Sequence, residues 1–192
     1  RAHPDRFIGY TKVDPHFPER IPQELETRLE QDGIRHIKVH PHGHNYPVTG
    51  ENYRPAWEWG SAHGSVVLAH TTLGHSTCSP SMFAELAQNY PDVTFLIGHS
   101  GNDRDGYKES VEAALQYENL YLETCGWCAT SLGALEYMVE KIGADRILFG
   151  TDFVWIGAPF QLGAIAYANI SDEDKRKIFG LNAMRLFGLS AM

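Results

Sequence analysis

Short apolar runs alternate with amphipathic segments along most of the 192-residue chain. Six runs are rich in β-branched and aromatic residues, which favour strands. Successive runs begin 28, 31, 27, 27 and 26 residues apart. They are RFIGYTKV from Arg6, IRHIKVH from Ile34, SVVLAHT from Ser65, DVTFLIGH from Asp92, NLYLETC from Asn119 and DRILFGTD from Asp145. The pattern predicts six strands at near-constant spacing.

The segments between these runs have the apolar spacing of helices that bury one face. Gly33 and Gly143 follow two of them as stop signals, and Ser171 with Asp174 three residues later opens the last one. The predicted helices are PQELETRLEQDG, RPAWEWGSAHG, SPSMFAELAQNYP, YKESVEAALQYEN, SLGALEYMVEKIG and SDEDKRKIFGLNAMRLFGL.

Strands that alternate with helices pair in parallel, because each helix carries the chain back to the starting edge of the sheet. The repeat fits either a (β/α) barrel or an open doubly wound sheet. The chain has no Gly-x-Gly-x-x-Gly after its first strand and no phosphate-binding Gly-rich loop ending in Lys-Ser or Lys-Thr, which disfavours the nucleotide-binding open sheet. We therefore predict an α/β, TIM-barrel-like fold in one domain, residues 1–192.

Charge and hydropathy exclude several kinds of partner. The formal net charge is −8 and basic residues are not clustered, so we expect no nucleic acid partner. No stretch approaches the roughly 20 apolar residues of a membrane span, and the first residues lack the apolar core of a signal peptide. A small-molecule substrate is the expected partner.

The three cysteines, Cys78, Cys125 and Cys128, are an odd and low number, which predicts a reducing compartment and hence the cytoplasm. Cys125 and Cys128 form a C-x-x-C motif. It is either a redox pair, half of a zinc site or a coincidence of the loop. The last is favoured, because the chain has no second C-x-x-C and no thioredoxin-like pattern around this one.

Polar side chains end each predicted strand, and in a (β/α) barrel the chemistry lies at these ends. Three of them form a chemical set: His70, His99 and Asp152. Imidazole and carboxylate are common ligands of zinc and of other divalent metals. A single His at a strand end is more often only hydrogen bonded, and Gly-Thr-Asp is often only a turn. Three potential ligands at the ends of three strands of one regular repeat favour a metal site.

Several stretches resemble the amidohydrolase-related group of the metal-dependent hydrolase superfamily. They are HPDRFIGYTKVDP, GIRHIKVHP, VVLAHT, LAQNYPDVTFLIGHSG, NLYLETC, GADRILFGTDF and ISDEDKRKIFGLNAMRLFGL. The order of the motifs carries the resemblance, which covers nearly all of the chain. It implies a distorted (β/α)8 barrel with one metal, commonly zinc, at the strand ends.

The resemblance also implies roles for individual residues. His70 matches a histidine ligand of the metal, and Asp152 matches an aspartate that binds the metal and takes a proton from water. His99 matches a histidine that contacts the activated water or the substrate. Lys38 and His40 match a Lys-x-His-Pro stretch that lines the substrate site. We expect one divalent metal, zinc, in a complete site.

The chain departs from the family at its start. Family members carry a His-x-His motif on the first strand, whereas this sequence resembles strands three to eight and begins at Arg1. We expect strands one and two to be missing, which would leave an incomplete site and exposed sheet edges. A second copy of the chain could cover these edges in a homo-oligomer.

Three functions remain open at this stage. The leading one is hydrolysis of an amide, lactone or related bond by a metal-activated water. The second is decarboxylation by the same residues, since family members catalyse either reaction. The third is a non-catalytic truncated fragment that acts, if at all, by self-association.

Overall fold

In a computed structural model, the residues described are 7–126 and 131–189, and they form a sheet of six parallel strands. The strand order is β1-β2-β3-β4-β5-β6, so each strand pairs with its neighbours in the sequence. The strands are β1 (Tyr10–Lys12), β2 (His36–Val39), β3 (Val66–His70), β4 (Thr94–Gly98), β5 (Leu120–Glu123) and β6 (Ile147–Leu148). Because all six are parallel, their carboxyl ends lie at one edge of the sheet.

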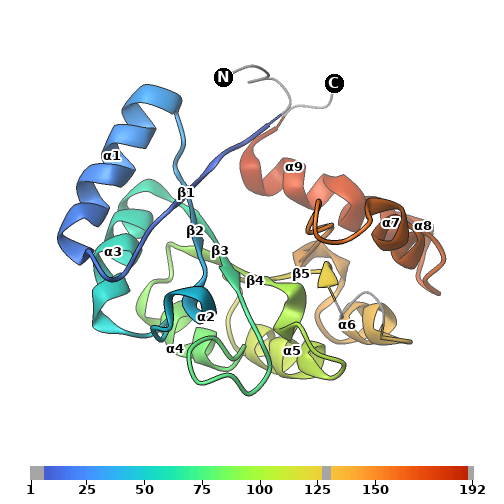
Figure 1. Cartoon of the computed structure of the whole chain (residues 1–192). Coiled ribbons are helices and arrows are strands. Elements are labelled where there is room, and N and C mark those ends of the chain that lie inside the picture. The colour runs from blue at the N-terminus through green and yellow to red at the C-terminus, as the bar shows by residue number, and fades with distance from the viewer. Residues whose placement is uncertain (1–6, 127–130, 190–192) are drawn as a thin grey trace.

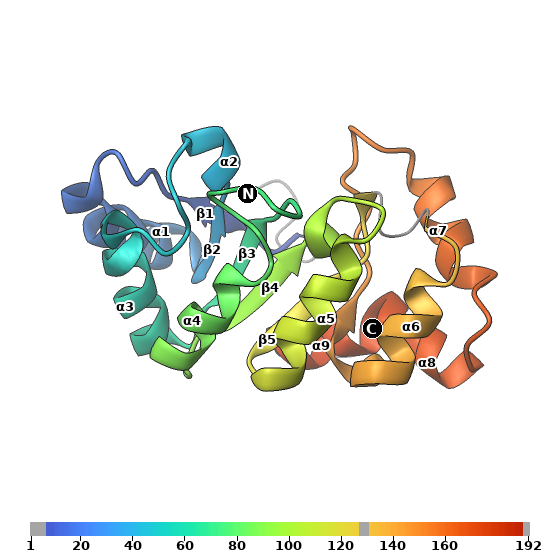
Figure 2. The ribbon, with the colours of Figure 1, turned by 90° about the horizontal axis from the view of Figure 1, so that it is seen from below.

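Helices follow the strands and cover the outer face of the curved sheet. Figure 1 shows α1, α3, α4, α5 and α6 one after another around this face, and Figure 2 shows the last four side by side. The helices are α1 (Ile21–Asp32), α2 (Pro41–His44), α3 (Arg54–His63), α4 (Met82–Asn89), α5 (Gly106–Gln116), α6 (Ala134–Ile142), α7 (Ala158–Ala166), α8 (Asp172–Arg176) and α9 (Asn182–Phe187). Strand and helix therefore alternate as in a (β/α) barrel.

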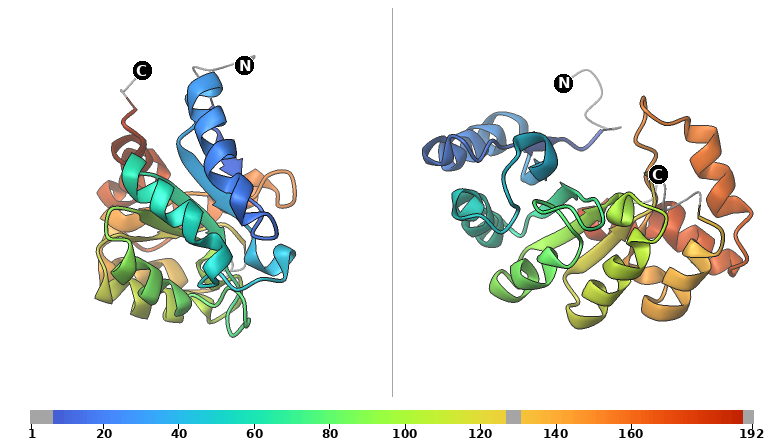
Figure 3. Two further views of the ribbon diagram at one scale, coloured as in Figure 1. Left: turned by 90° about the vertical axis from the view of Figure 1, so that its left-hand side faces the viewer. Right: turned by 60° about the horizontal axis from the view of Figure 1, so that its bottom comes forward.

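The main hydrophobic core lies between the sheet and the outer helices. Trp57 of α3, Phe83 of α4 and Phe95 of β4 are fully buried there, and the rings of Trp57 and Phe95 meet edge to face with centroids 5.6 Å apart. The left view in Figure 3 shows α1 and α3 side by side on this face. This core fixes the strands and so fixes the positions of their ends.

The inner face of the sheet is partly covered by α9. Val66, Leu96 and Leu148 project from three strands and pack against Leu186 and Phe187 of this helix. The Phe187 ring also lies 5.1 Å from the ring of His36 on β2 and 6.2 Å from the ring of Tyr10 on β1. The closing helix thus spans the inner face from β1 to β6.

The structure confirms the six predicted strands and the six predicted helical segments. Gly33 and Gly143 end their helices with positive φ, and the Ser171 hydroxyl accepts a hydrogen bond from the Asp174 N–H. The last helix is divided into α8 and α9 by a π-helical turn, Lys177–Leu181. Two helices were not predicted: α7, which is apolar on most sides, and α2, which is four residues long.

Within the described residues, no helix is both long and apolar enough to span a bilayer. The single domain over residues 1–192 stays a prediction.

Candidate active site

Two of the predicted residues meet directly at the carboxyl edge of the sheet. His70 is the last residue of β3, and His99 follows β4 immediately. The strand register pairs His70 with Gly98, so the two histidines start from adjacent positions. Their rings meet edge to face with centroids 4.8 Å apart and an interplanar angle of 67°. The parallel register therefore brings together residues 29 positions apart in the sequence.

His40 lies on the other side of His70. The two rings are stacked, with centroids 4.1 Å apart and an interplanar angle of 9°. The Nδ1 atom of His40 accepts a hydrogen bond from the Gly43 N–H at 2.9 Å, which caps the short helix α2. His40 therefore supports the ring of His70 from behind. Its predicted contact with a substrate stays a prediction.

A cavity of about 310 Å³ opens at the strand ends, beside His99. Its polar lining includes Lys38, His99, Glu123 and Asp152. The rest of the lining is largely apolar and comes from the inner face of the sheet and from α9: Tyr10, Leu68, Leu96, Leu148, Phe149, Ala183 and Phe187. A cavity with a few convergent polar groups on an apolar wall is typical of a small-molecule site.

Lys38 contributes an amine to the lining of this cavity. Burial lowers the pKa of Lys38 below its ordinary value, while the negative charges of Glu123 and Asp152 oppose that shift. Burial also lowers the pKa of His99, again against the influence of the same two carboxylates. Two basic groups, on Lys38 and His99, therefore share the cavity with two acidic groups, on Glu123 and Asp152. Such clusters of titratable groups are typical of sites that catalyse proton transfer.

Asp152 follows β6 and is exposed on the cavity wall. Its carboxylate makes no hydrogen bond with another described residue, so its oxygen atoms are available to a ligand. Its charge acts on the pKa values of Lys38, His99 and Cys125, which places it near all three. The structure thus joins Asp152 to the cavity that His99 lines.

Three residues around the cavity adopt a backbone conformation that favours glycine. The φ angles are 66° at His99, 43° at Ser100 and 51° at Asp152. The Ser100 hydroxyl donates to the carbonyl oxygen of Glu123 at 2.8 Å, which holds this turn against β5. Such angles cost free energy and cluster at functional sites, where the surrounding structure imposes them.

The chemistry of His70 and Asp152 fits a divalent cation. Burial, together with the nearby His40 and His99, lowers the pKa of His70 to about 3, so this imidazole is neutral at physiological pH. Its Nε2 atom contacts the Thr72 hydroxyl at 3.1 Å, which leaves the Nδ1 atom to bind a metal ion. A neutral imidazole nitrogen and an unpaired carboxylate are ligands that zinc and manganese both accept.

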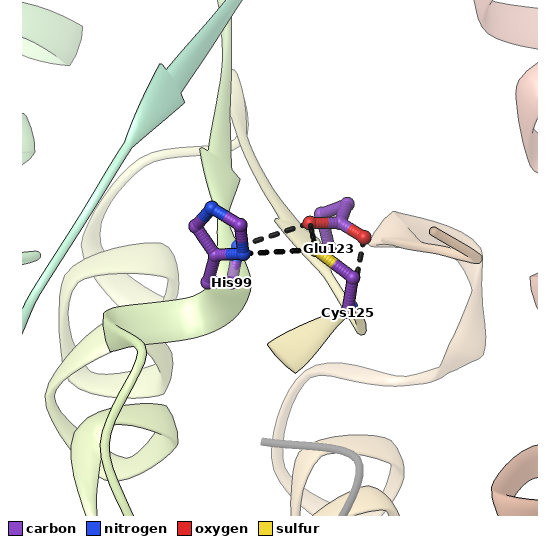
Figure 4. Close-up of side chains that lie close together, drawn as sticks. All are labelled: His99, Glu123 and Cys125. Carbon is purple, nitrogen blue, oxygen red and sulfur yellow. Dashed lines mark hydrogen bonds between the residues drawn. The ribbon is translucent and has the colours of Figure 1, made fainter. Parts of the chain in front are cut away.

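A second group of ligand atoms lies beside His99. The imidazole of His99, the carboxylate of Glu123 and the thiol of Cys125 are all buried, and their ligand atoms lie within 4.8 Å of one another. The Cys125 Sγ atom lies 2.8 Å from Glu123 Oε2 and 2.9 Å from His99 Nδ1. Figure 4 shows the thiol between the ring and the carboxylate.

Backbone groups hold the Glu123 carboxylate in place. Its Oε2 atom accepts the N–H of His99 at 2.9 Å, and its Oε1 atom accepts the N–H of Cys125 at 2.8 Å. Gly150 leaves room for it, because a Cβ atom at that position would overlap the carboxylate. The glycine before Thr151 and Asp152 is therefore required by a side chain on the neighbouring strand.

Glu123 and Cys125, at the end of the fifth strand, were not predicted as site residues, and Cys125 was considered only as part of the C-x-x-C motif. Their period-two spacing places both side chains on the same face of the strand as the cavity, which is the signal that could have found them. Cys78 and Cys125 are buried free thiols. Cys128, the second cysteine of the C-x-x-C motif, lies outside the described residues.

Comparisons with known proteins agree with this fold. A sequence model of the amidohydrolase family matches residues 1–189. A gamma-resorcylate decarboxylase from Polaromonas sp. (strain JS666 / ATCC BAA-500) is 24% identical, over 97% of this chain and 72% of its own length.

Two crystal structures show the same barrel architecture. A TIM-barrel protein from Bordetella bronchiseptica superposes with a TM-score of 0.82 at 20% identity, covering 98% of this chain and 69% of its own. A dihydroxybenzoic acid decarboxylase from Polaromonas sp. JS666, with bound manganese and 2-nitroresorcinol, gives 0.74 at 22% identity, covering 100% and 72%. The TIM-barrel-like fold is thereby confirmed.

Proposed function

The chain belongs to the amidohydrolase family, and from this premise we propose that it is a metal-dependent decarboxylase of a small ring-bearing carboxylic acid. One observation carries the proposal: the amine of Lys38 and the imidazole of His99 share a cavity with an apolar wall. An amine in its charged form pairs with a carboxylate, an imidazole transfers protons, and an apolar wall accepts a flat ring.

Hydrolysis is the leading prediction from the sequence. The named relatives instead support decarboxylation. One is a gamma-resorcylate decarboxylase, and the structural relative with manganese is a dihydroxybenzoic acid decarboxylase. Hydrolysis stays the second candidate, because His99 and Asp152 could equally accept a proton from water. The fragment hypothesis is the third, and it requires that the isolated chain bind no metal.

Lys38 would orient the substrate. Its amine lies among Glu123, Asp152 and Cys125, so a substrate carboxylate that enters the cavity finds one cationic partner. The ring of the substrate would then lie against the side chains of Leu68, Leu96 and Phe187. A contact of this kind sets which bond faces His99.

His99 would carry the proton. The bond between the ring carbon and the carboxyl group breaks, CO₂ leaves, and the electron pair stays on the carbon. That carbon takes a proton from the Nε2 atom of His99, which has first accepted it from the substrate or from water. Burial lowers the pKa of His99, which favours the neutral imidazole before the first transfer and makes the protonated ring a better donor in the second.

His70 and Asp152 would hold the metal. When bound, a divalent cation supplies positive charge that stabilises negative charge developing on substrate oxygen atoms. A catalytic metal takes about three protein ligands, so we expect at least one more ligand besides these two. The donor set suits manganese, which the dihydroxybenzoic acid decarboxylase holds, as well as zinc, which stays a prediction.

Self-association and a cytoplasmic location are further proposals from the sequence. Exposed apolar side chains favour the first, since Phe153, Val154 and Trp155 all project from the loop after β6 with at least 74% of their surface exposed. Apolar patches of this kind often mark contacts between proteins. Light scattering after gel filtration would show a dimer or larger assembly if the chain self-associates, and a monomer if it does not.

Product analysis tests the proposed function. The chain is incubated with Mn²⁺ or Zn²⁺ and with a panel of hydroxybenzoic acids and lactones. We expect CO₂ and the decarboxylated phenol from at least one acid, and loss of this activity with a chelator. Ring-opened acids from the lactones would support hydrolysis instead, and no product together with no bound metal would support the fragment hypothesis.

A further inference from the structure

The contacts around Cys125 fix where the protons lie. A thiol has one proton, and an ionised carboxylate only accepts hydrogen bonds. The 2.8 Å separation between Sγ and Glu123 Oε2 therefore requires that the thiol proton lie between them. The thiol then has only lone pairs left to offer His99. The 2.9 Å contact of Sγ with His99 Nδ1 requires that Nδ1 carry the hydrogen.

The same distances argue against a metal ion between these three groups. A tetrahedral zinc with bonds of 2.0 Å to nitrogen and 2.3 Å to sulfur separates the two ligand atoms by roughly 3.5 Å. The separation between His99 Nδ1 and Cys125 Sγ is 2.9 Å. Glu123 cannot move away easily, because two backbone N–H groups and the close approach to Gly150 hold it. The group is a hydrogen-bonded chain.

We propose that Cys125, held by Glu123, is a positioning residue that keeps His99 in the Nδ1–H tautomer. The Nε2 atom, which points away from Cys125 in Figure 4, then carries the free lone pair of a ring that lines the cavity. This inference rests on the proposed function for its effect on the reaction. The tautomer itself can be measured whether or not the reaction occurs.

The arrangement gives each of the three residues a separate task. Glu123 accepts a hydrogen bond from the thiol and so orients the sulfur. Cys125 accepts the Nδ1–H of His99 and so orients the ring. Of these three residues, His99 is the one that exchanges a proton with the substrate, through its Nε2 atom. Burial raises the pKa of the Cys125 thiol well above its ordinary value, consistent with a thiol that keeps its proton.

Nitrogen NMR of histidine-labelled protein tests the inference. The spectrum is recorded with Zn²⁺, which is diamagnetic, and again with a chelator, and the His99 signals are identified by their loss in His99→Asn. We expect the chain to show a pyrrole-type shift for Nδ1 and a pyridine-type shift for Nε2. The opposite pair of shifts, or averaged shifts, would overturn the proposal.

Variants add a second readout. Cys125→Ser keeps a group that donates to Glu123 and accepts from His99, so it should keep the tautomer. Cys125→Ala removes that group, so the Nε2–H form should appear and kcat should fall about 10–100-fold with KM changed less than about twofold. Cys78→Ala alters another buried free thiol and is the matched control for lost packing. An unchanged tautomer in Cys125→Ala would contradict the inference.

The proposed decarboxylase function and the positioning role of Cys125 can be refuted independently of each other. A chain that shows the expected tautomers but releases no CO₂ from any acid would refute the decarboxylase and leave the positioning role standing. A chain that decarboxylates with the Nε2–H tautomer would refute the positioning role alone.

Discussion

The imidazole rings of His70 and His99 meet edge to face, with centroids 4.8 Å apart, at the ends of two adjacent parallel strands. The contact joins a proposed metal ligand to a proposed proton carrier. It follows from the register of β3 and β4, in which His70 pairs with the residue before His99. Substitutions at the strand ends should therefore separate metal binding from proton transfer.

His70→Asn should lower metal affinity by at least about 100-fold, because the imidazole is a direct ligand in the proposed site. Metal content after dialysis, measured by mass spectrometry, checks this. His63→Asn is the matched control: this histidine stacks on Trp59 at the far end of α3, with centroids 3.9 Å apart. Equal metal content in both variants would remove His70 from the ligand set.

Lys38→Met should raise KM for a carboxylate substrate about 10–100-fold, since a hydrogen bond between charged groups contributes about 1.5–3 kcal/mol. Methionine keeps the length of the side chain and removes the charge. Lys12→Met provides the control, because Lys12 pairs with Lys38 in the strand register but lies outside the cavity lining. A KM that rises equally in both variants would argue against a specific contact at Lys38.

Gly150→Ala should disturb the hydrogen-bonded chain of Glu123, Cys125 and His99 without replacing any of its three side chains. The new Cβ would overlap the Glu123 carboxylate, which must move and release the N–H groups that it accepts. We expect a loss of about 1–3 kcal/mol in the free energy of unfolding, as in other overpacked sites, and a lower kcat. Gly163→Ala on α7 has open space around it and should leave kcat unchanged, while the higher helix propensity of alanine should raise the free energy of unfolding by about 0.5–1 kcal/mol.

His36 should make the protein less stable in mild acid. It is 4% exposed between Tyr10 and Phe187, and burial, with a smaller contribution from Arg35, lowers its pKa to about 4. The unfolded chain, with a pKa near 6.5, binds this proton first. The stabilisation is therefore present above about pH 6.5 and is lost as the pH falls towards 4, by roughly 2–3 kcal/mol.

Urea unfolding at several pH values measures this dependence. His36→Gln should flatten the decline in the free energy of unfolding between pH 6.5 and 4. Parallel curves for the variant and the parent chain would show that other groups cause the decline.

The fold could be predicted from the sequence because its signal is local and repeated. Each strand is a short β-rich run, and the helix ends at Gly33 and Gly143 follow from the need for positive φ. The helix α7 was missed because it is apolar on most sides and so lacks an amphipathic period. Register then placed His70 beside His99 without further information.

The inner part of the site depends on packing that a sequence does not display. Glu123 looks like an ordinary acidic residue at a strand end until its carboxylate is seen to accept two backbone N–H groups. Gly150 looks like a turn residue until the carboxylate of Glu123 is seen to occupy the space that a side chain at position 150 would need. The contacts of Glu123 with the His99 N–H and with Gly150 join neighbouring strands, so the spacing of residues along β5 does not reveal them.

The most direct test of the account follows one carbon atom through the reaction. A hydroxybenzoic acid labelled with ¹³C in its carboxyl group is incubated in D₂O with the chain and Mn²⁺, alongside His99→Asn. The account predicts ¹³CO₂, deuterium at the carbon that lost the carboxyl group, and a rate about 10²–10⁴-fold lower in the variant with its metal retained. A chain that binds metal yet releases no ¹³CO₂, or a variant as fast as the parent, would contradict it.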